Sequence, residues 1–125
     1  MARQAVTSDR IAPPVGPFSQ AVRAGEFLYL SGQVAQDRAT GRLIAGDIAA
    51  HTDHILQNLA RLLEAAGKTM DDVIRVGVFL TDMADFPAMN AAYAKHFAPP
   101  YPARTTIAVA ALPLGARIEI ELVAK

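Results

Sequence analysis

The chain has 125 residues, 52% of them hydrophobic, which predicts one domain over residues 1–125 with a single core. Twelve Lys and Arg residues balance twelve Asp and Glu residues, so the chain lacks the basic field that supplies most non-specific nucleic-acid affinity, and we expect no nucleic-acid partner. The absence of cysteine excludes disulfides, thiolate zinc sites, iron–sulfur clusters and thiol nucleophiles.

The N-terminal third predicts a stiff lead-in followed by a β-hairpin. Residues 1–10 contain no apolar signal core, and no apolar run approaches the roughly 20 residues that cross a bilayer. We therefore expect a cytoplasmic protein without a membrane partner. Residues 12–17 are rich in proline and cannot be helical. Residues 18–23 and 27–34 predict two strands joined by a tight turn.

The middle of the chain predicts two helices with a buried strand between them. Asp47 is suited to cap a helix that continues to Ala66, because apolar side chains recur there at spacings of three and four. Gly67 follows, where a left-handed residue ends many helices. Residues 73–80 are nearly all apolar and predict an interior strand covered on both faces. Asp85 is expected to cap a second helix. The buried positions of that helix are Phe86, Met89, Tyr93 and Phe97.

The last two predicted strands cover residues 104–110 and 117–123. The element order is then β-β-α-β-α-β-β, which predicts an α+β fold with two helices on one face of a mixed sheet. Alternation along the strands separates the aliphatic side chains from Arg104, Thr106 and Glu119. If the aliphatic faces lie under the helices, these three side chains point to the uncovered face, which a partner subunit could cover.

Arg104 and Glu119 together predict a site for a small acid. A guanidinium binds a carboxylate through two parallel hydrogen bonds, and a glutamate can hold a water or accept its proton. The alternative is an ordinary surface ion pair in which Glu119 bonds to Arg117 or Arg104. Such a pair stabilises a sheet by less than about 1 kcal/mol.

The residues in their order and spacing resemble one family, the Rid family (RidA/YjgF, reactive intermediate deaminases). The resemblance covers nearly the whole chain and depends on the combination of short motifs. These are Gly16-Pro17-Phe18-Ser19-Gln20-Ala21, Leu30-Ser31-Gly32-Gln33, Asn58-Leu59, Ala65-Ala66-Gly67, Val78-Phe79-Leu80-Thr81-Asp82, Asn90-Ala91-Ala92-Tyr93, Pro102-Ala103-Arg104, Leu112-Pro113 and Ile118-Glu119-Ile120-Glu121.

The resemblance implies a chorismate-mutase-like fold and a homotrimer with inward-facing sheets and three clefts between subunits. It also implies an enzyme of the 2-iminobutanoate/2-iminopropanoate deaminase type. Such enzymes hydrolyse a 2-imino acid or its enamine, such as 2-aminoacrylate, to a 2-oxo acid and ammonia. These intermediates escape from pyridoxal-phosphate dehydratases, so the family role is detoxification. The cofactor belongs to the dehydratases, and none is implied here.

Carried over to this sequence, the family pattern assigns a role to each matching residue. Arg104 would bind the substrate carboxylate, and Glu119 would orient or activate the water. Ser31 and Gly32 would line the cleft, with backbone groups available to the substrate. Asn90 would lie at the edge of the cleft. Without the family pattern, Asn90 would be expected simply to bond a loop backbone.

Two positions depart from the family pattern. Thr106 stands where archetypal members often carry cysteine, and its hydroxyl can still hold a water. Phe18 stands where they carry tyrosine, so it keeps the ring and loses the phenolic hydrogen bond. Phe18 therefore leaves open a divergent member that acts on another enamine. Otherwise, Thr106 is an ordinary strand residue and Phe18 packs at an interface.

Two further functions and a metal site are weighed against the deaminase. A non-catalytic trimer would bind small carboxylates without turnover. A ribonuclease, the activity that some family descriptions name, is disfavoured by the neutral charge and the absence of a basic stripe. A metal site at His51 and His54 is disfavoured because no third ligand stands at an established spacing. We therefore expect no metal, and we expect His51 and Asp53 to lie on a solvated helix face.

Overall fold

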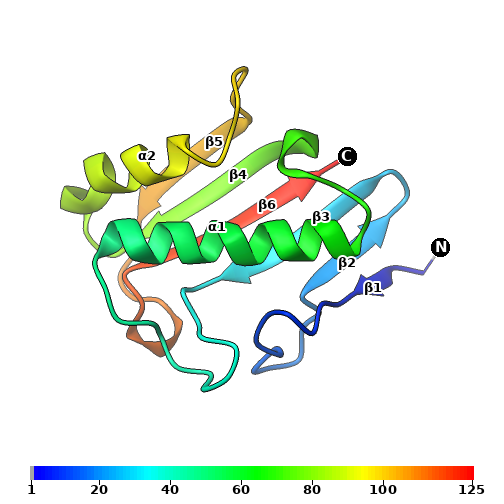
Figure 1. Cartoon of the computed structure of the whole chain (residues 1–125), viewed down its shortest axis with the longest axis horizontal. Helices are drawn as coiled ribbons and strands as arrows, with labels where there is room; N and C mark the ends of the chain where they lie inside the picture. Colours follow the sequence, from blue (N-terminus) through cyan, green and yellow to red (C-terminus); the bar gives the residue numbers. More distant parts are fainter. Residues whose placement is uncertain (1) are drawn as a thin grey trace.

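The computed structural model describes residues 2–125 and shows two helices on one face of a six-stranded sheet (Figure 1). The strands are β1 (Gln4–Val6), β2 (Ala21–Ala24), β3 (Phe27–Gln33), β4 (Val73–Leu80), β5 (Ala103–Ala108) and β6 (Ile118–Ala124). The helices are α1 (Ile48–Ala65) and α2 (Phe86–Ala94), and the short 3-10 turns are η1 (Met70–Asp72), η2 (Met83–Asp85) and η3 (Pro113–Gly115). This arrangement confirms the predicted α+β class. Neither α1 nor α2 has the length and apolar composition that crossing a bilayer requires.

The strands follow the order β1-β2-β3-β6-β4-β5 across the sheet. β4 and β5 pair in parallel, and the other neighbours are antiparallel, so the sheet is mixed as predicted. β4 lies between β5 and β6, so the last two strands of the chain are not neighbours in the sheet. β5 is an edge strand, and its position decides where Arg104 can reach.

The core lies between the sheet and the two helices, and it includes Met89 and Tyr93 of α2; Figure 1 shows this layering of helices on the sheet. Asp47 caps α1 as predicted: its carboxylate accepts a hydrogen bond from the Ala50 amide at 2.9 Å. Gly67 follows the helix with φ of +77°, the left-handed conformation expected there. The aliphatic side chains of α1 that are fully buried are Ile55, Leu56, Leu59, Leu62 and Leu63.

No helix formed by residues 2–125 lies over the opposite face of the sheet. On β4, Val76 and Val78 are fully buried on the helix side. On the open face, Tyr29 and Ile107 remain 49% and 45% exposed. The expectation that residues 73–80 are covered on both faces is therefore wrong for one copy of the chain, which leaves large apolar side chains in contact with solvent.

The N-terminal part differs from its prediction in two ways. Residues 18–20 precede β2 as irregular backbone, in which the Phe18 amide donates to the Gly16 carbonyl at 2.9 Å. The unpredicted strand β1 pairs with β2 and forms the other sheet edge. A three-residue strand carries too little alternation to be recognised in a sequence.

Asp85 lies at the N-terminal position of α2 but does not cap it through its side chain. Its carboxylate instead accepts a hydrogen bond from Arg117 at 2.8 Å. The preceding turn is capped by Asp82, which accepts from the Ala84 amide at 2.9 Å. The predicted position of Asp85 at the start of α2 is confirmed, but the side-chain cap is wrong, because the Asp85 backbone is already helical, with φ of −80° and ψ of −6°, and not extended as in a capping residue.

Candidate functional site

Arg104 lies on the helix face of the sheet, beside α2. It pairs with Val76 in the parallel β4–β5 register, and Val76 is buried beneath the helices. The Arg104 guanidinium donates to the Asn90 side-chain oxygen at 2.7 Å. Its central carbon lies 4.7 Å from the centroid of the Tyr93 ring and 5.7 Å from that of Phe86. Two aromatic rings and one amide thus fix the orientation of this cation.

The guanidinium borders a cavity of about 340 Å³. Among residues 2–125, Arg104 forms no ion pair with a carboxylate, so its charge is available to an anionic ligand. The Tyr93 and Thr106 hydroxyls are buried without a hydrogen-bond partner. Burial raises the pKa of Tyr93, and the charge of Arg104 opposes the shift. The cavity is lined by Asn90, Tyr93, Ala94, Tyr101, Pro102 and Arg104.

Glu119 lies on the opposite face of the sheet. Its neighbours Ile118 and Ile120 are fully buried on the helix side, so alternation turns Glu119 to the open side. Burial raises the pKa of the Glu119 carboxyl, and the nearby charge of Glu121 raises it further. A carboxyl of this kind holds a proton more readily than an exposed one, as suits a group that receives a proton from water.

Gly32 allows the Glu119 carboxylate to approach the backbone of β3. A Cβ atom at position 32 would lie 2.2 Å from Glu119 Oε2 and 2.8 Å from its Cδ. Both residues border a second cavity of about 220 Å³, and Phe18, 47% exposed, forms part of its wall. The structure therefore brings together the predicted residues Glu119, Gly32 and Phe18.

Ser31 does not offer its backbone N–H to a substrate, although the family pattern implied that it would. Its hydroxyl donates to the Ser19 carbonyl at 2.6 Å, and its amide donates to the Gln20 carbonyl at 2.9 Å. Because its backbone N–H is already bonded, that group is not available to a substrate in the manner expected. Ser31 instead fixes the segment next to Phe18, while its hydroxyl oxygen keeps a lone pair free.

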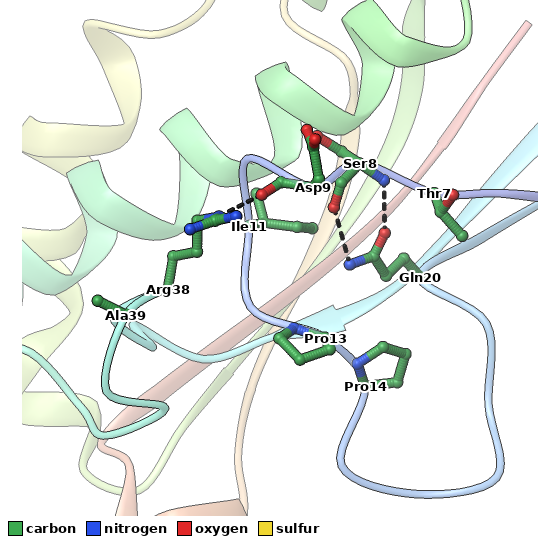
Figure 2. A pocket seen from close by; sticks show the side chains of 9 residues that line it. All are labelled: Thr7, Ser8, Asp9, Ile11, Pro13, Pro14, Gln20, Arg38 and Ala39. Carbon is green, nitrogen blue, oxygen red and sulfur yellow. Dashed lines mark hydrogen bonds between the residues drawn. The ribbon is translucent and has the colours of Figure 1, made fainter.

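Gln20 organises the N-terminal wall of the Glu119 cavity. It is 3% exposed, and its amide accepts from the Ser8 amide at 2.7 Å and donates to the Ser8 and Ala12 carbonyls at 3.3 and 3.1 Å. Figure 2 shows the bonds to Ser8 beside a neighbouring cavity of about 510 Å³. Pro13 and Pro14 border both cavities. Gln20 thus fixes the chain that leads into the Glu119 cavity.

The two groups proposed from the sequence as one pocket lie on different faces of the chain. The expectation that Arg104 and Thr106 share the open face with Glu119 is wrong. In the β4–β5 register, Arg104 and Thr106 face the helices, and Ile107 is the residue that points to the open side. The error came from assigning the aliphatic side of β5 to the core, although β5 is an edge strand next to α2. The alternative of a surface ion pair is also wrong, since no cation among residues 2–125 pairs with Glu119.

Comparison with known proteins identifies the family. The family model described as Endoribonuclease L-PSP matches residues 8–125. The chain belongs to the YjgF/RidA family. A RutC family protein of Pyrococcus horikoshii is 43% identical over 122 residues, which cover 98% of this chain and 97% of the relative. A 2-iminobutanoate/2-iminopropanoate deaminase of Dermatophagoides farinae is 40% identical over 122 residues, with coverage of 97% and 95%.

A solved structure supports the same assignment. RidA from the Antarctic bacterium Psychrobacter sp. PAMC 21119 superposes with a TM-score of 0.93 at 38% identity, covering 98% of each chain. This likeness confirms the chorismate-mutase-like fold that the sequence resemblance implied. Proteins named imine deaminases among the relatives support a Rid deaminase as the general class of this chain.

In this member of the YjgF/RidA family, sequence reasoning missed Tyr93 as a neighbour of the site. The sequence predicts Tyr93 as a buried helix residue, but its ring also packs against the Arg104 guanidinium in a cation–π contact. The Asn90-Ala91-Ala92-Tyr93 motif contained the signal, because residues three apart lie on the same helix face. The Asn90 side chain accepts a hydrogen bond from Arg104, so the alternative of a bond to a loop backbone is wrong.

The histidines of α1 have structural contacts. The ring nitrogens of His51 and His54 lie 3.0 and 2.8 Å from carbonyl oxygens of the segment before α1. His51 is 7% exposed, so its assignment to a solvated face was wrong, whereas Asp53 is half-buried and binds His96 at 2.8 Å. In the described part of the chain, no three side chains of metal-ligating type gather into a site.

Proposed function

We propose that this protein is a 2-imino-acid deaminase. It hydrolyses 2-imino acids or their enamine tautomers, such as 2-aminoacrylate, to 2-oxo acids and ammonia. The observation that carries the proposal is the Arg104 guanidinium, which is oriented by Asn90 and Tyr93, borders a cavity and has no carboxylate partner in residues 2–125. A planar cation held in this way binds a carboxylate in two parallel hydrogen bonds. The names of relatives such as the Dermatophagoides farinae deaminase support the reaction class.

The proposed chemistry needs a fixed substrate and one activated water. Arg104 binds the substrate carboxylate and thereby orients the adjacent imine carbon, which lowers the entropic part of the barrier. Glu119 accepts a proton from the attacking water, a contribution of about 10²- to 10⁴-fold for general-base catalysis. The new C–O bond becomes the carbonyl of the 2-oxo acid, and the C=N bond is lost as ammonia leaves with the transferred protons. No cofactor takes part in this step.

The proposal requires more than one copy of the chain. Arg104 and Glu119 lie on opposite faces of one sheet, so one copy would supply the carboxylate-binding half and a neighbour the water-activating half. The open sheet face, with Tyr29 and Ile107 about half exposed, supports an assembly through this surface. We propose a homotrimer with three such clefts, because a closed cyclic assembly repeats one contact between unlike surfaces. Its proposed role is cytoplasmic detoxification of imines released by dehydratases.

The test is a direct assay of enamine decay. A serine or threonine dehydratase generates the enamine from its amino acid, and the absorbance of the enamine is followed with and without the protein. Wild type should accelerate the decay, and Arg104→Ala should not. Arg42→Ala is the matched control, since Arg42 is exposed and lines none of the cavities described above. Equal decay with wild type and without protein would refute the proposal for these substrates.

Phe18 favours a second candidate function. The phenylalanine ring cannot make the hydrogen bond of the family tyrosine, so a trimer that binds small carboxylates with little turnover remains a distinct candidate. In that case, calorimetry would detect saturable, Arg104-dependent binding of 2-oxo acids, while the enamine assay would show no acceleration.

A further inference from the structure

Leu114 adopts a backbone conformation that leucine rarely takes. Its φ and ψ are 61° and 15°, and Gly115 follows with φ of +69°. The Ala116 amide donates to the Pro113 carbonyl at 3.1 Å and closes the turn. Positive φ at both central residues is the pattern of a type I′ turn, whose first central position is usually Asn, Asp or Gly. Leucine there is strained, and strain of this kind clusters at binding sites.

Core packing does not account for Leu114. Its side chain is 53% exposed, so burial in this chain does little to offset the strain. Leu114 instead lines the 220 Å³ cavity of Glu119, with Phe18 and Val15 as further apolar wall residues. These two are 47% and 70% exposed. The cavity therefore combines one carboxyl group with an exposed apolar wall.

We infer that Leu114 is a specificity-determining residue that, with Phe18, contacts the apolar side chain of the imino acid. The inference rests on the proposed function and names its substrate class: 2-imino acids with branched aliphatic or aromatic side chains. The three-carbon 2-iminopropanoate has one methyl group to place against this wall. Because each added methylene in a hydrophobic pocket changes kcat/KM by about 10- to 200-fold, the protein favours the larger substrates.

The experiment compares imines of different size. An L-amino-acid oxidase generates the imines of alanine, leucine and phenylalanine, and semicarbazide trapping measures how fast each disappears. In wild type, kcat/KM should be highest for the leucine or phenylalanine imine. In Leu114→Gly, the ratio of the leucine-imine value to the alanine-imine value should fall by about 10-fold or more. Glycine takes positive φ without steric penalty, so the thermal midpoint should not fall.

Met83→Ala is the matched control, because Met83 is an exposed large apolar residue, 43% exposed, that lines neither cavity. This variant should keep the wild-type ratio. An unchanged ratio in Leu114→Gly would overturn the inference and leave the deaminase intact. A changed assembly mass in native mass spectrometry with an unchanged ratio would assign Leu114 to a subunit contact and overturn it as well. No turnover of any imine by wild type would instead refute the proposed function itself.

Discussion

Replacing Gly32 by alanine should disable Glu119 without unfolding the protein. A Cβ at position 32 would lie 2.2 Å from Glu119 Oε2, whereas ordinary contacts are near 3.4 Å, so the carboxylate must move by about 1 Å. A misplacement of about 1 Å lowers a rate by about 10²-fold, which corresponds to about 2.7 kcal/mol in the activation barrier. We therefore expect kcat for imine hydrolysis to fall by about 10²-fold in Gly32→Ala.

Stability should change little, because the displaced atoms are the end of a flexible side chain and φ of Gly32 is not in the left-handed region. A Gly→Ala change under these conditions alters the free energy of unfolding by under about 1 kcal/mol. Gly77→Ala is the matched control, since its Cβ would meet Glu121 instead, at 3.1 Å. Because Glu121 acts on Glu119 only through its charge, this variant should lose far less activity than Gly32→Ala. Wild-type kcat in Gly32→Ala, with its assembly mass unchanged, would refute the role of Glu119.

Three further predictions concern stability. Asp47→Ala removes the acceptor of the Ala50 amide and should lower the free energy of unfolding in urea by about 1 kcal/mol; a loss below a few tenths would contradict the capping role. Tyr93→Phe removes a buried hydroxyl without a partner and should raise that free energy by about 1 kcal/mol; a large loss would reveal a hydrogen bond at this hydroxyl. The pKa of Glu119 is raised in the folded protein, so the folded state binds the carboxyl proton more tightly than the unfolded state does. The free energy of unfolding therefore falls as pH rises from the ordinary carboxyl pKa through the raised one. Glu119→Gln should therefore gain stability over wild type in thermal melts above that window and show no gain below it; a gain independent of pH would contradict the shift.

Much of the fold was predictable because the signals were local. The cap at Asp47, the left-handed Gly67 and the apolar run of residues 73–80 each follow from the preferences of a few neighbouring residues. β1 was not predictable in this way, because a three-residue strand has too little pattern and depends on its pairing with β2. Strand order was likewise not local, since the insertion of β4 between β5 and β6 is a tertiary event.

The site was predicted in its residue types and not in its arrangement. Arg104 and Asn90 bond to each other, and Glu119 lies against Gly32, as their shared roles implied. Alternation along β5 did not reveal which face of the sheet Arg104 occupies. An edge strand beside a helix can place a cation against aromatic rings, and in β5 this leaves Ile107 on the exposed face. The aliphatic residues of β5 therefore pointed to the wrong side.

The most direct test of the account is subunit complementation between Arg104→Ala and Glu119→Gln. Each variant alone should be nearly inactive, since each lacks one half of every proposed site. When the two variants are co-expressed and mix at random in a cyclic trimer, a site is intact where an unchanged Arg104 of one copy meets an unchanged Glu119 of the next. This holds for about a quarter of the sites, so about a quarter of wild-type activity should return. Recovery to that level would support a site shared between copies. No recovery, with mixed assemblies verified by native mass spectrometry, would contradict it.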